Sequence, residues 1–162
     1  MGSPEGNSAL AVVARVTLII AATALCALAV VQGWQVFARY VLNDAPSWTE
    51  PLALLLMNFA MMFGAAAGAH SGTHFGFFLL PQALTGLPQR LLLSASNLVC
   101  AGIALLLSVW AARLVVDGWS VTIAGTALPQ GINYLPLACG GALIGLFSLS
   151  HLWQLWRSSA GT

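Results

Sequence analysis

Charged residues are what this sequence most lacks. Only four of its 162 residues are acidic and five are basic, and all five basic residues are arginines. The surface of a water-soluble domain needs more, since about a quarter of the residues of such a domain are charged. The low count therefore excludes an ordinary soluble protein. The net charge of +1 and the scattered arginines also exclude the basic patch by which proteins bind nucleic acid.

Cysteine is also scarce, and its spacing excludes the common metal centres. Cys26, Cys100 and Cys139 stand singly within apolar runs, and none lies at the spacing of a zinc or iron–sulfur motif. Single cysteines in such surroundings behave as small buried hydrophobic residues. We therefore expect no metal site, and we identify no set of residues that would make the protein an enzyme.

Apolar residues make up 59% of the sequence and are grouped into four long segments. Each can cross about 30 Å of hydrocarbon as a helix, which satisfies its own backbone hydrogen bonds in lipid. We expect one all-α membrane domain over residues 1–162. Its four transmembrane helices are expected at about residues 10–40, 47–70, 89–117 and 133–157. The run at about residues 74–87 is too short to cross, so we expect a short interfacial helix there, between the second and third spans.

The arginines predict the orientation of this domain. The first apolar run is longer than the core of a signal peptide, so we expect it to be retained as a span. With four spans, both chain ends lie on the same side. Placing them in the cytoplasm puts Arg15, Arg90 and Arg157 inside and Arg39 and Arg113 outside, which is the excess that the positive-inside rule expects. We therefore predict cytoplasmic N- and C-termini.

Glycines at four-residue spacing mark two helix faces. Gly64, Gly68 and Gly72 recur in the run GAAAGAHSG, and Gly141 and Gly145 repeat the spacing in the last segment. Small residues at this spacing allow two membrane helices to approach closely. We expect these faces to pack helices, either within the bundle or against a second membrane protein.

The charged residues near the spans have local structural explanations. Ser47 and Glu50 form the S-x-x-E pattern of a capping box before the second span, although an acid at this level also suits an ion pathway. Arg113 and Asp117 stand four residues apart, so we expect them to pair on one helix face, unless they contact a partner subunit instead.

The three histidines raise the alternative of a b-type cytochrome-like membrane anchor. His70 and His74 are four residues apart, and His151 lies in the last segment. Haem ligands would have to come from different helices at compatible depths. Gly72 interrupts between His70 and His74 and places that pair at the end of its span. An absorption spectrum of the purified chain would test this alternative.

The most specific pattern in the sequence joins the first two spans. It reads GWQVFARYVLNDAPSWTE at residues 33–50, and GAHSGTH follows the next span at residues 68–74. It resembles the small membrane subunit of the TRAP transporters, the DctQ-like family, on the residues Arg39, Tyr40, Asn43, Trp48, Thr49, Glu50, Gly72 and His74. The resemblance runs from about residue 38 to residue 74 and continues in LPQR at residues 87–90 and YLPL at residues 134–137.

The sequence departs from the family pattern at three positions. Pro51 and Leu54 stand where a second acid and a basic residue usually follow Trp-Thr-Glu. His70 stands where a basic residue commonly precedes the Gly-x-His. These departures affect the contacts that the missing groups would make, and leave the rest of the pattern intact.

The resemblance implies a non-catalytic subunit of a sodium-coupled organic-acid importer in the bacterial inner membrane. In such a transporter the large permease subunit carries the substrate and the sodium, and the small subunit binds it as a heterodimer and helps dock a periplasmic binding protein. We expect no cofactor in this chain, although bound membrane lipid is compatible with it. We expect Arg39, Tyr40, Trp48 and Glu50 to shape the docking surface. A small self-assembling exporter that uses Glu50 as its coupling carboxylate is the other alternative, and it would transport solute without other chains.

Overall fold

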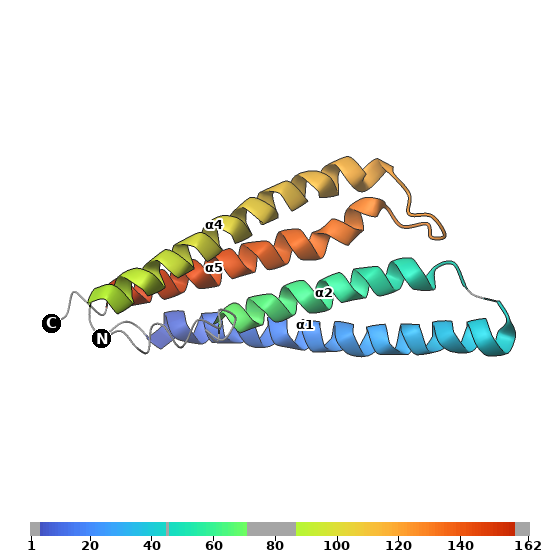
Figure 1. Ribbon diagram of the computed structural model, residues 1–162, viewed down its shortest axis with the longest axis horizontal. Coiled ribbons are helices and arrows are strands. Elements are labelled where there is room, and N and C mark those ends of the chain that lie inside the picture. Colours follow the sequence, from blue (N-terminus) through green and yellow to red (C-terminus); the bar gives the residue numbers. More distant parts are fainter. Residues whose placement is uncertain (1–3, 45, 71–86, 158–162) are drawn as a thin grey trace.

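The computed structural model describes residues 4–44, 46–70 and 87–157, and four long helices make up most of them (Figure 1). The four helices are α1 (Pro4–Phe37), α2 (Thr49–His70), α4 (Leu87–Asp117) and α5 (Leu135–Arg157). A π-helix, η1 (Ala38–Leu42), continues α1, and two 3₁₀ turns, η2 (Gly118–Ser120) and η3 (Gln130–Tyr134), lie between α4 and α5. The expected all-α fold with four long helices is confirmed. The expected interfacial segment, except for residue 87, lies outside the described residues.

Each of the four helices, in three cases together with the short helix that adjoins it, forms a stretch long and apolar enough to cross a membrane. These stretches are Leu10–Leu42, Thr49–His70, Leu91–Ser120 and Gln130–Trp156. The shortest has 22 residues, and at about 1.5 Å per residue it is about 33 Å long, which matches the hydrocarbon of a bilayer. The first has 33 residues, so its last turns extend beyond the level at which α2 begins.

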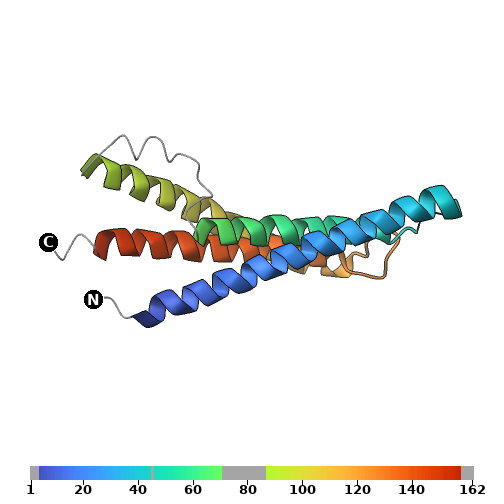
Figure 2. The ribbon, with the colours of Figure 1, turned by 90° about the horizontal axis from the view of Figure 1, so that it is seen from below.

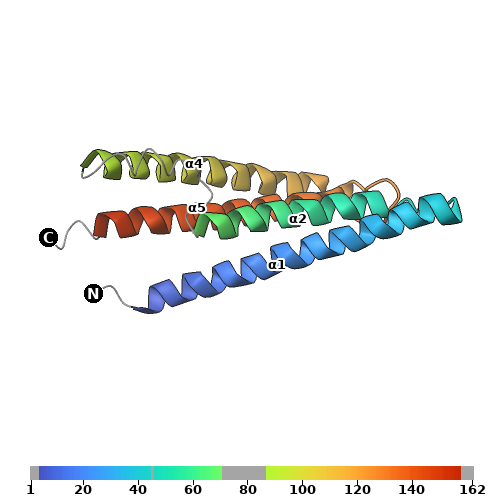
Figure 3. The same ribbon diagram turned by 60° about the horizontal axis from the view of Figure 1, so that its bottom comes forward.

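The helices lie side by side in the order α1, α2, α5, α4. The extensive contacts join α1 with α2, α2 with α5 and α5 with α4, so that α1 and α4 occupy the two edges. Figure 2 and Figure 3 show α1 crossing its neighbours obliquely. The start of α1 and the end of α5 lie at one end of the molecule, here the terminal end. Residues 38–44, 46–48 and 118–134 lie at the opposite end, here the loop end.

Small residues fill the contacts between the helices. Of the thirteen buried hydrophobic residues in the described part of the chain, ten are alanines. Large residues such as Ile19, Met61 and Leu106 are more than half exposed. This distribution is the reverse of that in a water-soluble bundle, where large apolar side chains fill the core. It suits a bilayer, in which lipid tails solvate leucine and valine and small residues bring the helix backbones together.

α5 is the helix that its neighbours approach most closely. A Cβ atom at Gly140 would lie 2.7 Å from the Cβ of Met62 on α2. A Cβ at Gly141 would lie 2.9 Å from the carbonyl oxygen of Ala104 on α4. A Cβ at Gly145 would lie 2.8 Å from the side chain of Leu105. Gly141 and Gly145 therefore pack α5 against α4, inside the chain's own bundle.

Candidate functional site

The loop end begins where α1 changes into a π-helix. Residues 38–42 form η1, and Asn43 ends it in the left-handed conformation with φ 55°, its N–H donating to the carbonyl of Ala38. Asparagine tolerates this conformation better than other residues with a side chain. Short π-helical turns often occur at functional sites, and this one carries Arg39 and Tyr40. The hydropathy pattern of the sequence did not predict this π-helix, because a π-helical turn requires no particular amino-acid composition.

The connections of the two helix pairs meet at this end. Residues 121–129 form a tight loop in which the N–H of Ile123 donates to the carbonyl of Leu128 over 2.9 Å. At its tip the hydroxyl of Ser47 donates to the carbonyl of Gly125 over 3.3 Å. Gly125 has φ +83°, and a Cβ there would lie 2.8 Å from the carbonyl oxygen of Ser47. Only glycine fits this contact without strain, so Gly125 joins the α1–α2 pair to the α4–α5 pair.

The start of α2 differs from the capping box expected of Ser47 and Glu50. α2 begins at Thr49, whose hydroxyl donates to the carbonyl of Pro46 over 2.8 Å and whose side chain is fully buried. The hydroxyl of Ser47 bonds Gly125 instead of capping the helix. The difference arises from a tertiary contact: the loop of residues 121–129 lies against Ser47 and provides a hydrogen-bond acceptor. The local S-x-x-E motif contains no information on that loop.

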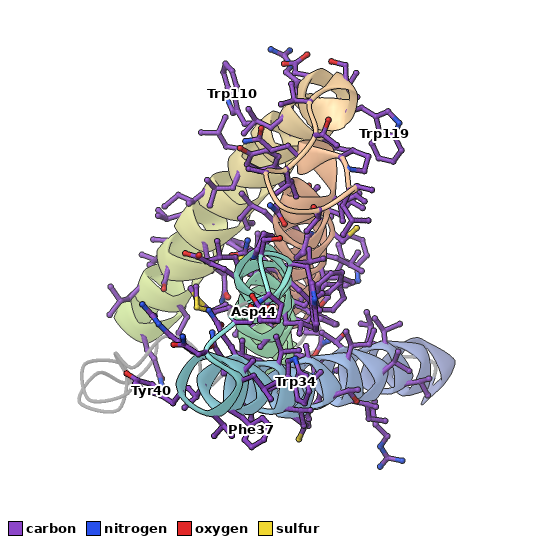
Figure 4. All side chains as sticks on the ribbon, turned by 90° about the vertical axis from the view of Figure 1, so that its right-hand side faces the viewer. Trp34, Phe37, Tyr40, Asp44, Trp110 and Trp119 are labelled. Carbon is purple, nitrogen blue, oxygen red and sulfur yellow. The ribbon has the colours of Figure 1, made fainter. Side chains whose placement is uncertain are left out.

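The four residues expected to shape a docking surface all lie on the α1–α2 side of the loop end. Tyr40 is 80% exposed and Trp48 is 43% exposed. Figure 4 shows Tyr40 and Phe37 projecting outward from the end of α1. Arg39 and Glu50 line one common pocket, although no ion pair joins them in the described structure. The structure thus divides the four residues into an exposed aromatic pair and a charged pair that shares a pocket.

This pocket, here the α1–α2 pocket, is an open cavity of about 400 Å³. Its lining combines charged, amide and apolar side chains: Leu28, Gln32, Gln35 and Arg39 from α1 and η1, and Glu50, Ala53, Leu54 and Met57 from α2. The Oε1 atom of Gln35 is buried and has no hydrogen-bond partner. A buried oxygen without a donor is unfavourable, so the pocket is incompletely satisfied by the chain itself.

Arg113 and Asp117 lie at the other edge of the loop end, on α4. The guanidinium of Arg113 lies over the ring of Trp110, 5.2 Å from its centroid, and no ion pair with Asp117 is present among the described residues. The expected pair is thus replaced by a cation–π contact. Such a contact suits the interface of a membrane, where arginine and tryptophan both concentrate. Figure 4 shows Trp110 and Trp119 far from Trp34, Phe37 and Tyr40.

His70 and His151 lie at the terminal end and join α2 to α5. The Nε2 atom of His151 is 2.9 Å from the carbonyl oxygen of His70, and the His70 ring packs edge-on against Phe147 at 5.1 Å. A carbonyl oxygen only accepts, so Nε2 of His151 must carry the hydrogen and is not available to bind iron in this arrangement. No group of three possible metal ligands occurs in the described ranges, and His74 lies outside them.

The α2 glycines differ from those of α5. A Cβ at Gly64 would meet only the Cβ of Ala21 on α1, at an ordinary 3.9 Å. Gly68 lies one turn further along α2, and Gly72 lies outside the described residues. The expected α2 face therefore contacts α1 at Gly64 without the close approach that Gly141 makes on α5.

Four helices able to cross a membrane, with small residues between them and large apolar residues outside, define a multi-pass membrane protein of the helical-bundle class. The family model of the tripartite ATP-independent periplasmic transporters, DctQ component, matches residues 28–158. Because this match covers most of the chain, the protein belongs to the DctQ family and is the small permease component of a TRAP transporter. Comparison with curated proteins found no match. The family region includes the α1–α2 pocket and both connections of the loop end.

Proposed function

We propose that this protein is the immobile scaffold of a sodium-coupled organic-acid importer in the bacterial inner membrane. It binds a large permease subunit as a heterodimer and helps dock a periplasmic binding protein. The observation that carries this proposal is the match of residues 28–158 to the DctQ component of these transporters. In the most apolar stretch of 18 residues in each span, only 17% to 33% of the residues are buried within the chain. The large remaining apolar surface can contact a second membrane protein as well as lipid.

The described helices lack the features of a self-contained carrier. A transport path usually needs helices broken at mid-depth, or ionisable groups lining the path. Within the described ranges, α1, α2, α4 and α5 run without such a break. The charged residues Arg39, Glu50 and Arg113 all lie near the loop end of their helices. This arrangement favours a supporting subunit over the small exporter that would use Glu50 as a coupling carboxylate.

The proposed orientation places the terminal end in the cytoplasm and the loop end in the periplasm. Exposed Tyr40, Trp48 and Trp119 then lie at the periplasmic interface, where aromatic residues concentrate. Arg15, near the start of α1, then lies on the cytoplasmic side, as the positive-inside rule expects. In this orientation the periplasmic binding protein meets the loop end.

The central experiment is reconstitution of the chain with and without the large permease subunit of its transporter. We expect the two to purify together and to import an organic acid in the presence of sodium and the binding protein. We expect liposomes that contain only this chain to take up none. Uptake by this chain alone would contradict the scaffold proposal, and so would failure of the two subunits to associate. An absorption spectrum of the same sample tests the haem alternative.

The aromatic part of the docking surface is tested with Tyr40→Ala and Trp48→Ala. Exposed aromatic side chains often contribute a large share of binding energy at an interface, so we expect each variant to weaken binding-protein affinity about tenfold. Assembly with the large subunit should be unchanged. The matched control is Trp156→Ala, because Trp156 is 63% exposed but lies at the terminal end. Unchanged affinity and uptake in both loop-end variants would contradict the docking role.

A further inference from the structure

The α1–α2 pocket has a polar part and an apolar part at different depths. Arg39 and Glu50 line it near the loop end, while Leu28 and Met57 line it deeper along the same two helices. At about 1.5 Å per residue, the polar and apolar walls are separated by about 16 Å along α1 and about 10 Å along α2. Glu50 is in the first turn of α2, at the edge of a span of 22 residues. The polar part therefore lies at headgroup level and the apolar part lies in the hydrocarbon.

The pocket is lined by two residues of opposite charge that form no ion pair in the described structure. One cation, Arg39, and one anion, Glu50, line the same cavity, and the described structure has no ion pair between them. Gln32 adds an exposed amide, and Gln35 adds an amide oxygen without a donor. A molecule that suits this wall carries an anion and a hydrogen-bond donating cation a short distance apart, with no net charge.

We propose that the α1–α2 pocket binds a phospholipid whose zwitterionic headgroup ends in a primary ammonium, as in phosphatidylethanolamine. The phosphate lies at the guanidinium of Arg39, which is suited to phosphate oxygens. The ammonium donates to the carboxylate of Glu50, and the amide of Gln35, about one turn from Arg39, bonds a remaining polar atom of the headgroup. The acyl chains follow Leu28, Leu54 and Met57 into the bilayer. This site goes beyond the scaffold role and requires only that the chain spans a membrane.

The pocket discriminates among lipid classes on chemical grounds. The quaternary ammonium of a choline headgroup has no N–H to donate, so it cannot form a hydrogen bond with Glu50. A glycerol headgroup has no cation to offer Glu50, so the pocket would hold two anions, the phosphate and the carboxylate, with Arg39 as its one cation. An ammonium-bearing zwitterion avoids both problems. A polar helix of a partner protein is the competing occupant, and the experiment separates the two.

The experiment is native mass spectrometry of the full chain, alone and in complex with the large permease, after reconstitution with equal amounts of ethanolamine, choline and glycerol phospholipids. We expect one ethanolamine lipid to be retained with about tenfold preference over the other classes, because one charge-assisted hydrogen bond distinguishes them. Glu50→Gln should abolish the preference, and Arg39→Gln should reduce retention of all three classes. Met57→Trp, which fills the apolar part of the pocket, should also reduce all three.

The matched control removes the same two charge types from the other edge of the loop end. Arg113→Gln and Asp117→Asn lie on α4 and do not line the pocket, so they should retain the ethanolamine lipid like the natural chain. Circular dichroism of each variant should show unchanged helix content. Equal retention of the three classes by the natural chain would overturn the proposal. Crosslinking of residue 39 or 50 to the large permease, with no retained lipid in the complex, would assign the pocket to the partner instead.

Discussion

The two helix pairs of this protein are held together in different ways. Between α4 and α5, Gly141 approaches Ala104 closely, and the hydroxyl of Ser108 donates to the carbonyl of Ala138 over 2.7 Å. Between α1 and α2, the contact of Gly64 with Ala21 is ordinary, and an open pocket separates the helices toward the loop end. The backbones of α4 and α5 are thus in close contact, whereas α1 and α2 leave space for a ligand between them. The scaffold thus has a tight side and an open side.

The strongest test of this difference is the same substitution in the two pairs. Gly141→Ala places a Cβ 2.9 Å from a backbone oxygen, so α4 must move, and we expect a loss of about 1–3 kcal/mol in unfolding free energy. Gly64→Ala adds a methyl at ordinary contact distance and removes a flexible residue from a helix, so we expect a gain of about 0.5–1 kcal/mol. Thermal unfolding in detergent measures both. Effects of the same sign would show that the two pairs pack alike.

A second test breaks the contact between the pairs at the loop end. Gly125→Ala combines an unfavourable positive φ of +83° with a Cβ 2.8 Å from Ser47. We expect a loss of about 1–2 kcal/mol and increased hydrogen exchange in residues 121–129. The control is Gly102→Ala on α4, where a Cβ meets nothing within 4 Å. Unchanged exchange in that loop would mean that the junction contributes nothing to the coupling of the two pairs.

The smallest expected effect concerns the hydrogen bonds of the tight pair. Ser108→Ala removes the bond to Ala138 on α5, and we expect it to cost about 0.6 kcal/mol, the average for such bonds between membrane helices. Ser150→Ala is the matched control, because that hydroxyl bonds the carbonyl of Phe147 in its own helix. Its removal should change the unfolding temperature by less. Equal shifts would indicate that the hydroxyl of Ser108 does not join the two helices.

Hydropathy was sufficient to predict the class of fold and the four spans, because a helix in lipid is defined by the length of its apolar run. The pattern from Arg39 to Glu50 was sufficient to indicate the family. The order α1, α2, α5, α4 was not predictable, because in a bilayer the residues facing lipid and those facing another helix are similarly apolar.

The side-chain contacts of the candidate site were the least predictable feature. Ser47 bonds Gly125, which is 78 residues away along the chain, and a local capping motif carries no information on that neighbour. The guanidinium of Arg113 contacts the ring of Trp110 and not the carboxylate of Asp117, although both residues lie about one helical turn away. The α1–α2 pocket depends on how two oblique helices diverge, and the sequence has no periodic signal for that geometry.

The alanine-rich interior changes what a mutational scan of this protein would report. Mostly small residues fill the contacts between the helices, so shortening an outward leucine, isoleucine or tryptophan removes little of the internal packing. Loss of activity in such a variant would therefore locate the neighbouring subunit or the annular lipid, instead of a folding defect. The outward-facing side chains are in this sense a set of independent probes for mapping the assembled transporter.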